Sequence, residues 1–126
     1  MASSRKKVVK TAANDETCLQ MHCQQWLVKS GIWDRLLIFH VANERRGGIG
    51  THMHFKRMGV RKGVADYLAF PIGLRPTAIE LKDDKGDQKL GQEKFERQWA
   101  AAGGVYLVVR TVEEFQLHIN AIAGGT

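Results

Sequence analysis

The sequence predicts an α/β fold in which a mixed β-sheet is flanked by helices, with the element order αβββαβα. Three observations predict it: helical apolar periodicity in three segments, short apolar runs between those segments, and turns rich in Gly and Pro that separate them. An early hairpin makes two strands antiparallel, and a later crossover through a helix makes two strands parallel. The sheet is therefore expected to be mixed.

Three segments have the apolar spacing of helices. The first begins at Asn14 or Asp15, either of which is a suitable N-cap, and runs to about Lys29. The second covers about 90–102 and the third covers 112–122. The side chains expected to pack are Trp26 in the first helix, Gln92, Phe95 and Trp99 in the second, and Phe115, Ile119 and Ile122 in the third.

Short apolar runs predict the strands. A turn containing two prolines joins the second run to the third, which predicts a hairpin. Between the first and second runs, residues 43–63 are rich in Gly, Arg, Lys and His, so we expect a mobile basic loop there. The four runs are 36–41, 64–70, 77–82 and 105–110.

The length of 126 residues suits a single domain, which we expect over 14–122, after a flexible basic arm at 1–13 and before a tail at 123–126. No apolar run is long enough for a membrane span, and the basic N-terminus lacks the apolar core of a signal peptide. We therefore expect a cytoplasmic protein without a membrane partner. The two cysteines, Cys18 and Cys23, are expected to be reduced thiols.

The charge is strongly basic, with 19 Lys and Arg against 13 Asp and Glu, a net charge of +6. A polyanion is the natural partner of such a chain. An ordinary solvated surface is the competing interpretation for any single basic side chain. The residues that we expect to contact DNA phosphates are Arg45, Arg46, Arg57, Arg61 and Lys62.

The segment from Ile79 to Lys82 carries the clearest chemical signal. Side chains alternate along a strand, so Glu80 and Lys82 project to one face and the flanking apolar residues to the other. Asp66 lies on the neighbouring strand of the hairpin, which brings its carboxylate near that of Glu80. Mg²⁺ is commonly held by one or two carboxylates together with substrate phosphate. A surface Glu–Lys pair beside an unrelated aspartate is the alternative interpretation.

A wider set of motifs resembles the VRR-NUC family, which belongs to the PD-(D/E)XK nucleases. The resemblance covers roughly residues 14–120 and is closest to the small stand-alone members of phage and bacteria. The chain departs from the family pattern in two places, because Ala65 stands where the family usually has proline and Val109-Arg110-Thr111 stands where it has Val-Arg-Arg. The motifs are the run Gly59-Val60-Arg61-Lys62-Gly63-Val64-Ala65-Asp66-Tyr67-Leu68, then Ile79-Glu80-Leu81-Lys82, then Gln92 with Phe95, and then Gly103-Gly104 before 105–111.

This resemblance implies a restriction-endonuclease-like core and a DNA endonuclease that depends on Mg²⁺, for which Mn²⁺ can substitute. It implies structure-specific cleavage by a homodimer, similar to the Holliday-junction resolvases. The implied metal ligands are Asp66, Glu80, the backbone carbonyl of Leu81, and Glu16, and the implied catalytic residues are Asp66, Glu80, Lys82 and Gln92, the last bordering the site.

Other functions remain open from the residues alone. A nickase or a flap endonuclease would use the same site. A non-catalytic DNA-binding module would keep the fold without the chemistry, and a basic scaffold protein would carry the acidic trio by accident. His52 and His54 have no third soft ligand at a suitable spacing, which disfavours a transition-metal site.

Overall fold

The computed structural model of the chain describes residues 12–42, 49–83, 86 and 90–124, with 12–15 and 49–52 described in backbone only. Nearly all of the predicted arm and the end of the tail therefore lie outside the described residues. The elements are α1 (Ala12–Lys29), the short 3₁₀ turn η2 (Ile32–Asp34), β1 (Leu37–His40), α2 (Ile49–Arg57), β2 (Tyr67–Phe70), β3 (Thr77–Leu81), α3 (Leu90–Ala101), β4 (Val105–Val109) and α4 (Val112–Ala123).

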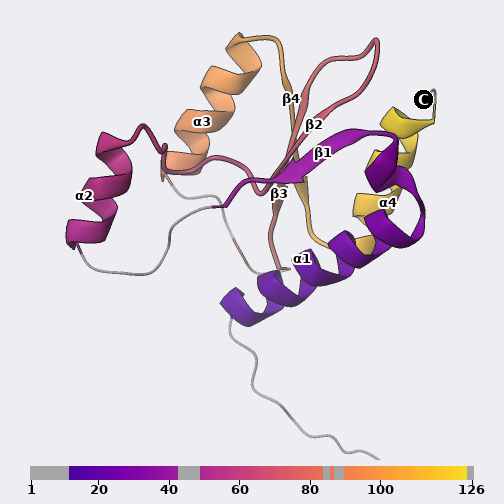
Figure 1. Cartoon of the computed structure of the whole chain (residues 1–126), viewed down its shortest axis with the longest axis horizontal. Helices are drawn as coiled ribbons and strands as arrows, with labels where there is room; N and C mark the ends of the chain where they lie inside the picture. Colours follow the sequence, from indigo (N-terminus) through magenta and orange to yellow (C-terminus); the bar gives the residue numbers. More distant parts are fainter. Residues whose placement is uncertain (1–11, 43–48, 84–85, 87–89, 125–126) are drawn as a thin grey trace, which may run out of the picture.

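The four strands form one sheet in the order β1-β2-β3-β4 (Figure 1). The first two pairs are antiparallel and β3 pairs with β4 in parallel. The parallel pair is joined through α3, since a parallel connection needs a crossover. The predicted mixed α/β fold is therefore confirmed.

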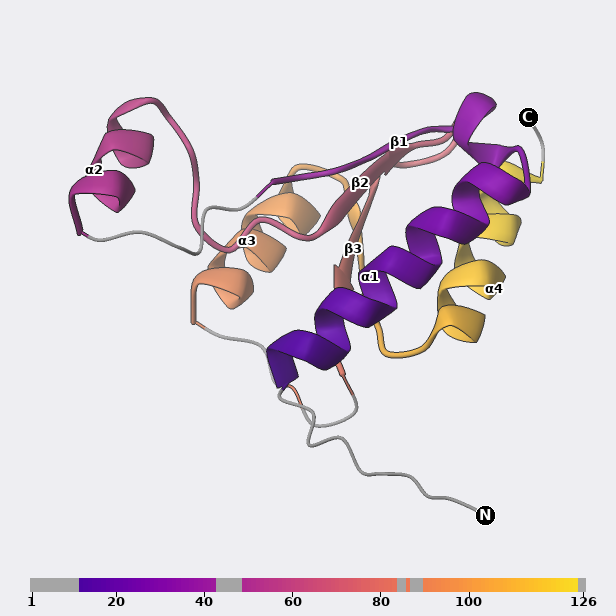
Figure 2. The same cartoon turned by 60° about the horizontal axis from the view of Figure 1, so that its bottom comes forward.

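Two helices bury one face of the sheet. Figure 2 shows α1 and α4 together on one side of the strands and α3 on the other. Trp26 of α1 and Tyr67 of β2 both contact Phe115 of α4, with ring centroids 6.1 and 5.5 Å apart, which confirms core packing for Trp26 and Phe115. The buried cluster on this face is Leu19, Cys23, Leu27, Ile32, Leu36, Ile38, Tyr67, Ala69, Ile79, Leu81, Val109, Phe115, Ile119 and Ala123.

The two cysteines are not bonded to each other, as predicted, and they differ in environment. Cys18 is exposed, whereas Cys23 lies on the buried face of α1, in the apolar cluster. Burial raises the pKa of the Cys23 thiol from its ordinary value of about 9 to about 12. Cys23 is therefore a neutral packing residue at physiological pH.

The opposite face of the sheet is only partly covered. Phe95 of α3 stacks on Trp99 and contacts Tyr106 of β4, with centroids 5.6 and 6.2 Å apart. The Trp99 indole N–H donates to the Val105 carbonyl at 2.8 Å, which closes the turn between α3 and β4. These contacts place α3 over the β4 side of this face.

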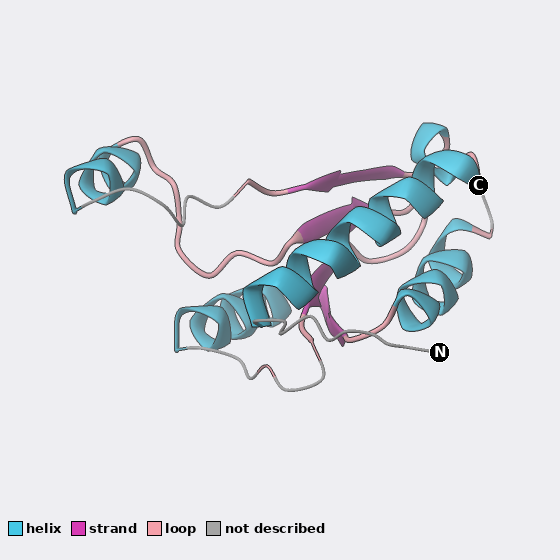
Figure 3. Ribbon diagram, turned by 90° about the horizontal axis from the view of Figure 1, so that it is seen from below, coloured by secondary structure: helices cyan, strands magenta, loops and turns pink. Residues whose placement is uncertain are grey.

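One prediction about the fold is wrong. Residues 49–57, expected in a mobile basic loop, form the helix α2. The glycines of this region suggested a loop, but after Gly50 the chain runs to Arg57 without Gly or Pro, which is enough for two helical turns. Figure 3 shows α2 standing apart from the sheet and the other helices.

Element boundaries also differ from those predicted. The first helix begins at Ala12, ahead of the expected caps Asn14 and Asp15, because alanine is the strongest helix former. The strand expected from Val64 begins only at Tyr67. The last helix reaches Ala123, one residue into the predicted tail. In the described part of the chain no helix is both long and apolar enough to cross a membrane.

Candidate active site

The candidate site lies where β3 ends, beside the start of β2 and the first turn of α3. The register pairs Tyr67 with Ile79, so the preceding residue of the first strand, Asp66, stands opposite the following residue of the second, Glu80. Because directly opposed residues share a face of an antiparallel pair, both carboxylates project to the side that α3 partly covers. The hairpin thus brings together the two acidic residues, as predicted.

Buried polar side chains concentrate at this end of the sheet. Asp66 is 8% exposed, Glu80 1% and Lys82 4%. Burying ionised groups costs free energy unless partners or a bound ion offset it. Among the described residues, the buried polar or charged side chains are Asp66, Thr77, Glu80, Lys82, Asp83 and Gln92, and only Thr77 comes from elsewhere.

Short contacts hold the central groups in place. The Gln92 side-chain amide donates to Glu80 Oε2 at 2.7 Å, and Lys82 Nζ lies 3.4 Å from the same oxygen. Asp66 Oδ2 accepts the backbone N–H of Leu81 at 2.7 Å. Sequence analysis placed these five residues in one site, and the structure brings them together.

The backbone of Leu81 completes this arrangement. In a strand, the N–H and C=O groups of one residue point to the same edge. The Leu81 N–H points to the β2 side, because it donates to Asp66. The Leu81 carbonyl therefore points to that side too, the side on which Asp66 lies, and its role as a metal ligand stays a prediction.

Glu16 lies in the first turns of α1, next to the loop that follows β3. A Cβ atom on Gly86 would lie 3.1 Å from Glu16 Oε2, 3.1 Å from Asp83 Oδ1 and 3.2 Å from Lys82 Cδ. These three side chains therefore surround Gly86. No group of three or more His, Cys, Asp or Glu side chains within the described residues is arranged to share one ion. Glu16 does not close a trio with Asp66 and Glu80 in this geometry, and its role as a ligand stays a prediction.

Asp83 and Arg110 are site residues that sequence analysis missed. Asp83 is buried directly after Lys82. Arg110 Nη1 donates to the carbonyls of Asp83 at 2.6 Å and Gly86 at 2.9 Å, so it holds the turn after β3. A sequence signal for Asp83 was its place next to the Glu-x-Lys segment. The contact of Arg110 joins distant parts of the chain and has no local signal.

The start of α4 fixes Arg110 itself. Its backbone N–H donates to Glu114 Oε1 at 2.7 Å, and the Glu114 N–H donates to the Thr111 hydroxyl oxygen at 3.1 Å. Thr111 is thus the N-cap of α4, and the Glu114 carboxylate accepts from the backbone of the preceding residue, Arg110. The backbone at Arg110 is consequently held by the first turn of α4.

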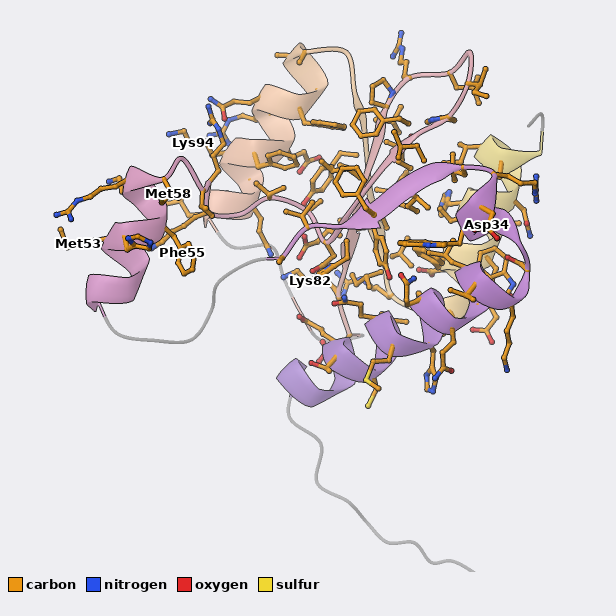
Figure 4. The ribbon with its side chains drawn as sticks, viewed as in Figure 1. Asp34, Met53, Phe55, Met58, Lys82 and Lys94 are labelled. Atoms are coloured by element: carbon orange, nitrogen blue, oxygen red, sulfur yellow. The ribbon has the colours of Figure 1, made fainter. Side chains whose placement is uncertain are left out.

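The predicted phosphate-binding residues lie at the end of α2, on the segment that leads to Asp66, or outside the described residues. Arg57 ends α2, and Arg61 and Lys62 follow on the segment that leads to Asp66; all three are exposed. Arg61 Nη1 donates to Gln98 Oε1 of α3 at 3.4 Å. Arg45 and Arg46 fall outside the described residues. In Figure 4, Met53 and Phe55 on α2 and Met58 directly after it lie well separated from Lys82.

The chemistry of the donor set fits a divalent cation. Two pairs of carboxylates lie near Lys82, namely Asp66 with Glu80 and Glu16 with Asp83. Their four formal negative charges exceed the positive charges of Lys82 and Arg110 by two. The donors are oxygens, which Mg²⁺ prefers, and two opposed carboxylates satisfy its usual requirement for protein ligands. His54 is exposed on α2 and belongs to no group of metal-binding side chains among the described residues; the His52 side chain is not described.

Comparisons with known proteins agree with the fold. No family model matches the sequence, and no curated protein matches it. A solved structure described as a VRR_NUC domain protein is similar to this chain, with a TM-score of 0.71 and 20% sequence identity. The similarity covers 87% of this chain and 88% of that protein. The chain therefore has the VRR-NUC fold, as the motif resemblance implied.

Proposed function

We propose that this protein is a metal-dependent DNA endonuclease that hydrolyses phosphodiester bonds and prefers branched DNA. The observation that carries the proposal is the buried pair of Glu80 and Lys82, opposed by Asp66 on the adjoining strand of a VRR-NUC fold. A structural core has no need for charged groups at this depth, and a site for a metal ion and a phosphate does.

Asp66, Glu80 and the carbonyl of Leu81 would hold Mg²⁺, and Mn²⁺ would be able to substitute. Glu16, which lies next to Gly86 together with Lys82, is the candidate for a further ligand. When bound, the ion supplies positive charge to the scissile phosphate and lowers the pKa of a coordinated water. The oxygen donors and excess negative charge of the site support this assignment.

Lys82 and Gln92 have separate roles in the proposal. The ammonium of Lys82 orients the attacking water and balances the negative charge that grows on the phosphate as the new P–O bond forms and the ester bond breaks. Gln92 donates to Glu80 Oε2 and so fixes the orientation of that carboxylate. Burial strengthens both effects, because electrostatic interactions are larger where water is excluded.

In this proposal, exposed basic residues hold the DNA. We assign this role to Arg57, Arg61 and Lys62, together with Arg45 and Arg46. Contacts with phosphates carry no sequence information, so recognition should follow the shape of the DNA. A homodimer would present two such sites to a branched substrate. The exposed apolar side chains of Leu37 and Phe39 on β1, at the edge of the sheet, support association with a second copy.

A cleavage assay tests the proposal. Wild type and Asp66→Asn are incubated with Mg²⁺ or EDTA on labelled linear, nicked, flapped and four-way DNA. Wild type should cut only with Mg²⁺, and Asp66→Asn should lose about 10² to 10³-fold in rate. Asp34→Asn is the matched control, because Asp34 is an exposed carboxylate on η2, away from Lys82 (Figure 4). Equal cutting by Asp66→Asn and wild type would refute the site.

Lys82→Ala separates the nuclease from a non-catalytic DNA-binding module. A nuclease should keep its DNA affinity in this variant but lose cleavage, whereas Lys29→Ala, which removes an exposed lysine at the end of α1, should cut normally. Wild type that binds DNA but never cuts any of the four substrates would favour the non-catalytic module.

A further inference from the structure

A close contact at a glycine, Gly63, joins α3 to the segment that carries Arg61 and Lys62, the basic segment. Gly63 has a φ of +80°, and a Cβ atom built on it would lie 2.8 Å from the backbone nitrogen of Gln92 and closer still to the carbonyl carbon and oxygen of Gly91. Real Cβ atoms do not approach a backbone this closely. The main chain at Gly63 therefore rests directly on the first turn of α3.

The contact excludes a side chain at Gly63 but leaves room for one at Gly91. A Cβ atom on Gly91 would lie 3.8 Å from Gly63 Cα, an ordinary contact. The atoms that Gly63 meets belong to the helix backbone, which cannot rotate away as a side chain can. Any side chain at Gly63 would therefore move the first turn of α3, the segment, or both.

This turn of α3 carries a residue of the candidate site. Gln92, whose backbone nitrogen is one of the atoms in contact, donates from its side chain to Glu80 Oε2 at 2.7 Å. On the other side of the contact, Arg61 and Lys62 immediately precede Gly63, and Arg61 reaches Gln98 further along α3. The contact thus joins the segment that carries Arg61 and Lys62 to the helix turn that carries Gln92.

We propose that Gly63 is a positioning residue, which seats the first turn of α3 so that Gln92 reaches Glu80. The basic segment and the site carboxylate then form one unit, and a substrate held by Arg61 and Lys62 meets a Glu80 that is already oriented. The effect on catalysis rests on the proposed nuclease function. The effect on the Gln92–Glu80 hydrogen bond does not depend on it.

Gly63→Ala tests the proposal, with Gly59→Ala as the matched control. Gly59 has a similar φ of +92°, but its added Cβ would have nothing within 4 Å. Both variants place a side chain on a residue with positive φ, so both should lower the melting temperature, and Gly63→Ala should lower it further because of the contact with α3. Only Gly63→Ala should also disturb Gln92. Any difference between the two variants then reports the contact with α3.

The first readout is the Gln92 side-chain amide in ¹H–¹⁵N spectra, identified by its absence from Gln92→Ala. The resonance should shift in Gly63→Ala and stay in place in Gly59→Ala. The second readout is kcat on cleavable DNA with Mg²⁺, which should fall roughly 10- to 100-fold in Gly63→Ala, the usual effect of losing a partner that orients a metal ligand. Gly59→Ala should stay near the wild-type kcat.

A double-mutant cycle distinguishes positioning from a general loss of stability. If Gly63 acts through Gln92, then Gly63→Ala combined with Gln92→Ala should be no slower than the slower single variant. Multiplied losses would overturn the proposal. So would an unchanged Gln92 resonance in Gly63→Ala.

If Gly63→Ala does not fold, Gly91→Val replaces it, because its γ-carbons open the same contact from the helix side without a strained φ. An unmoved Gln92 resonance in that variant would overturn the proposal. If wild type cuts none of the DNA substrates, the nuclease function fails, whereas the spectra still decide whether Gly63 seats Gln92.

Discussion

Charged side chains are usually exposed and apolar side chains are usually buried, but the sheet face that α3 partly covers shows the opposite in each of its two halves. On the β3 half, next to α3, Glu80 and Lys82 are charged and buried. On the half formed by β1 and β2, Leu37, Phe39 and Phe70 are apolar and exposed, and the rings of Phe39 and Phe70 stack 6.1 Å apart. The strand register places both sets on one face.

Comparison of the two faces of the sheet distinguishes the face that stabilises the fold from the face that is available for contacts. The face under α1 and α4 buries the main apolar cluster, which provides the hydrophobic stabilisation. The face that α3 half covers provides little by comparison. A buried charge and an exposed apolar side chain both reduce stability or solubility unless a metal ion, DNA or another protein chain uses them.

The largest expected effect contrasts two phenylalanines. Phe115→Ala should lower the free energy of unfolding by about 3 to 5 kcal/mol, because the Phe115 ring is fully buried against Trp26 and Tyr67. Phe39→Ala removes the same ring from the exposed half-face and should cost less than about 1 kcal/mol. Urea unfolding followed by tryptophan fluorescence measures both. Equal losses would mean that the two faces stabilise the fold alike.

The next effect separates stability from metal binding at the buried charges. At 100 times its Kd, Mg²⁺ should raise the free energy of unfolding of wild type by about 2.7 kcal/mol. Asp66→Asn should lose this increment, yet without Mg²⁺ it should be as stable as wild type within about 1 kcal/mol. The reason is that asparagine keeps an oxygen for the Leu81 N–H and removes one of the excess negative charges. An Mg²⁺-dependent increase in the variant would place the ion elsewhere.

A third effect sharpens the role of the exposed half-face. If a second copy covers β1, Leu37→Lys should weaken the dimer roughly 10- to 100-fold, the cost of burying an unpaired charge at an interface. Met21→Lys is the matched control, because Met21 on α1 is 56% exposed and Leu37 is 63% exposed. Sedimentation velocity over a concentration series measures both. If wild type is monomeric at every concentration, a second copy does not cover β1, and another partner is required for this face.

The same comparison explains what sequence analysis was able to predict. Strand alternation placed Glu80 and Lys82 on one face, and the hairpin placed Asp66 beside them, because both signals are local. The helix α2 was missed because its flanking glycines outweighed a short stretch of helix formers. Arg110 and Gly63 act through contacts with Gly86 and Gly91, which are distant in the chain. No local pattern encodes such contacts.

The smallest expected effect concerns DNA affinity. Arg61→Ala should weaken binding several-fold on every DNA substrate and reduce the slope of log K against log salt by about 1, since one phosphate contact is lost. Arg75→Ala removes an exposed arginine from the hairpin turn at the other end of β2 and β3 and should leave the slope unchanged. Fluorescence anisotropy at several salt concentrations, with EDTA to prevent cleavage, measures the slopes. Because the basic segment adjoins Asp66, equal slopes for Arg61→Ala and wild type would mean that DNA approaches the buried charges from another side.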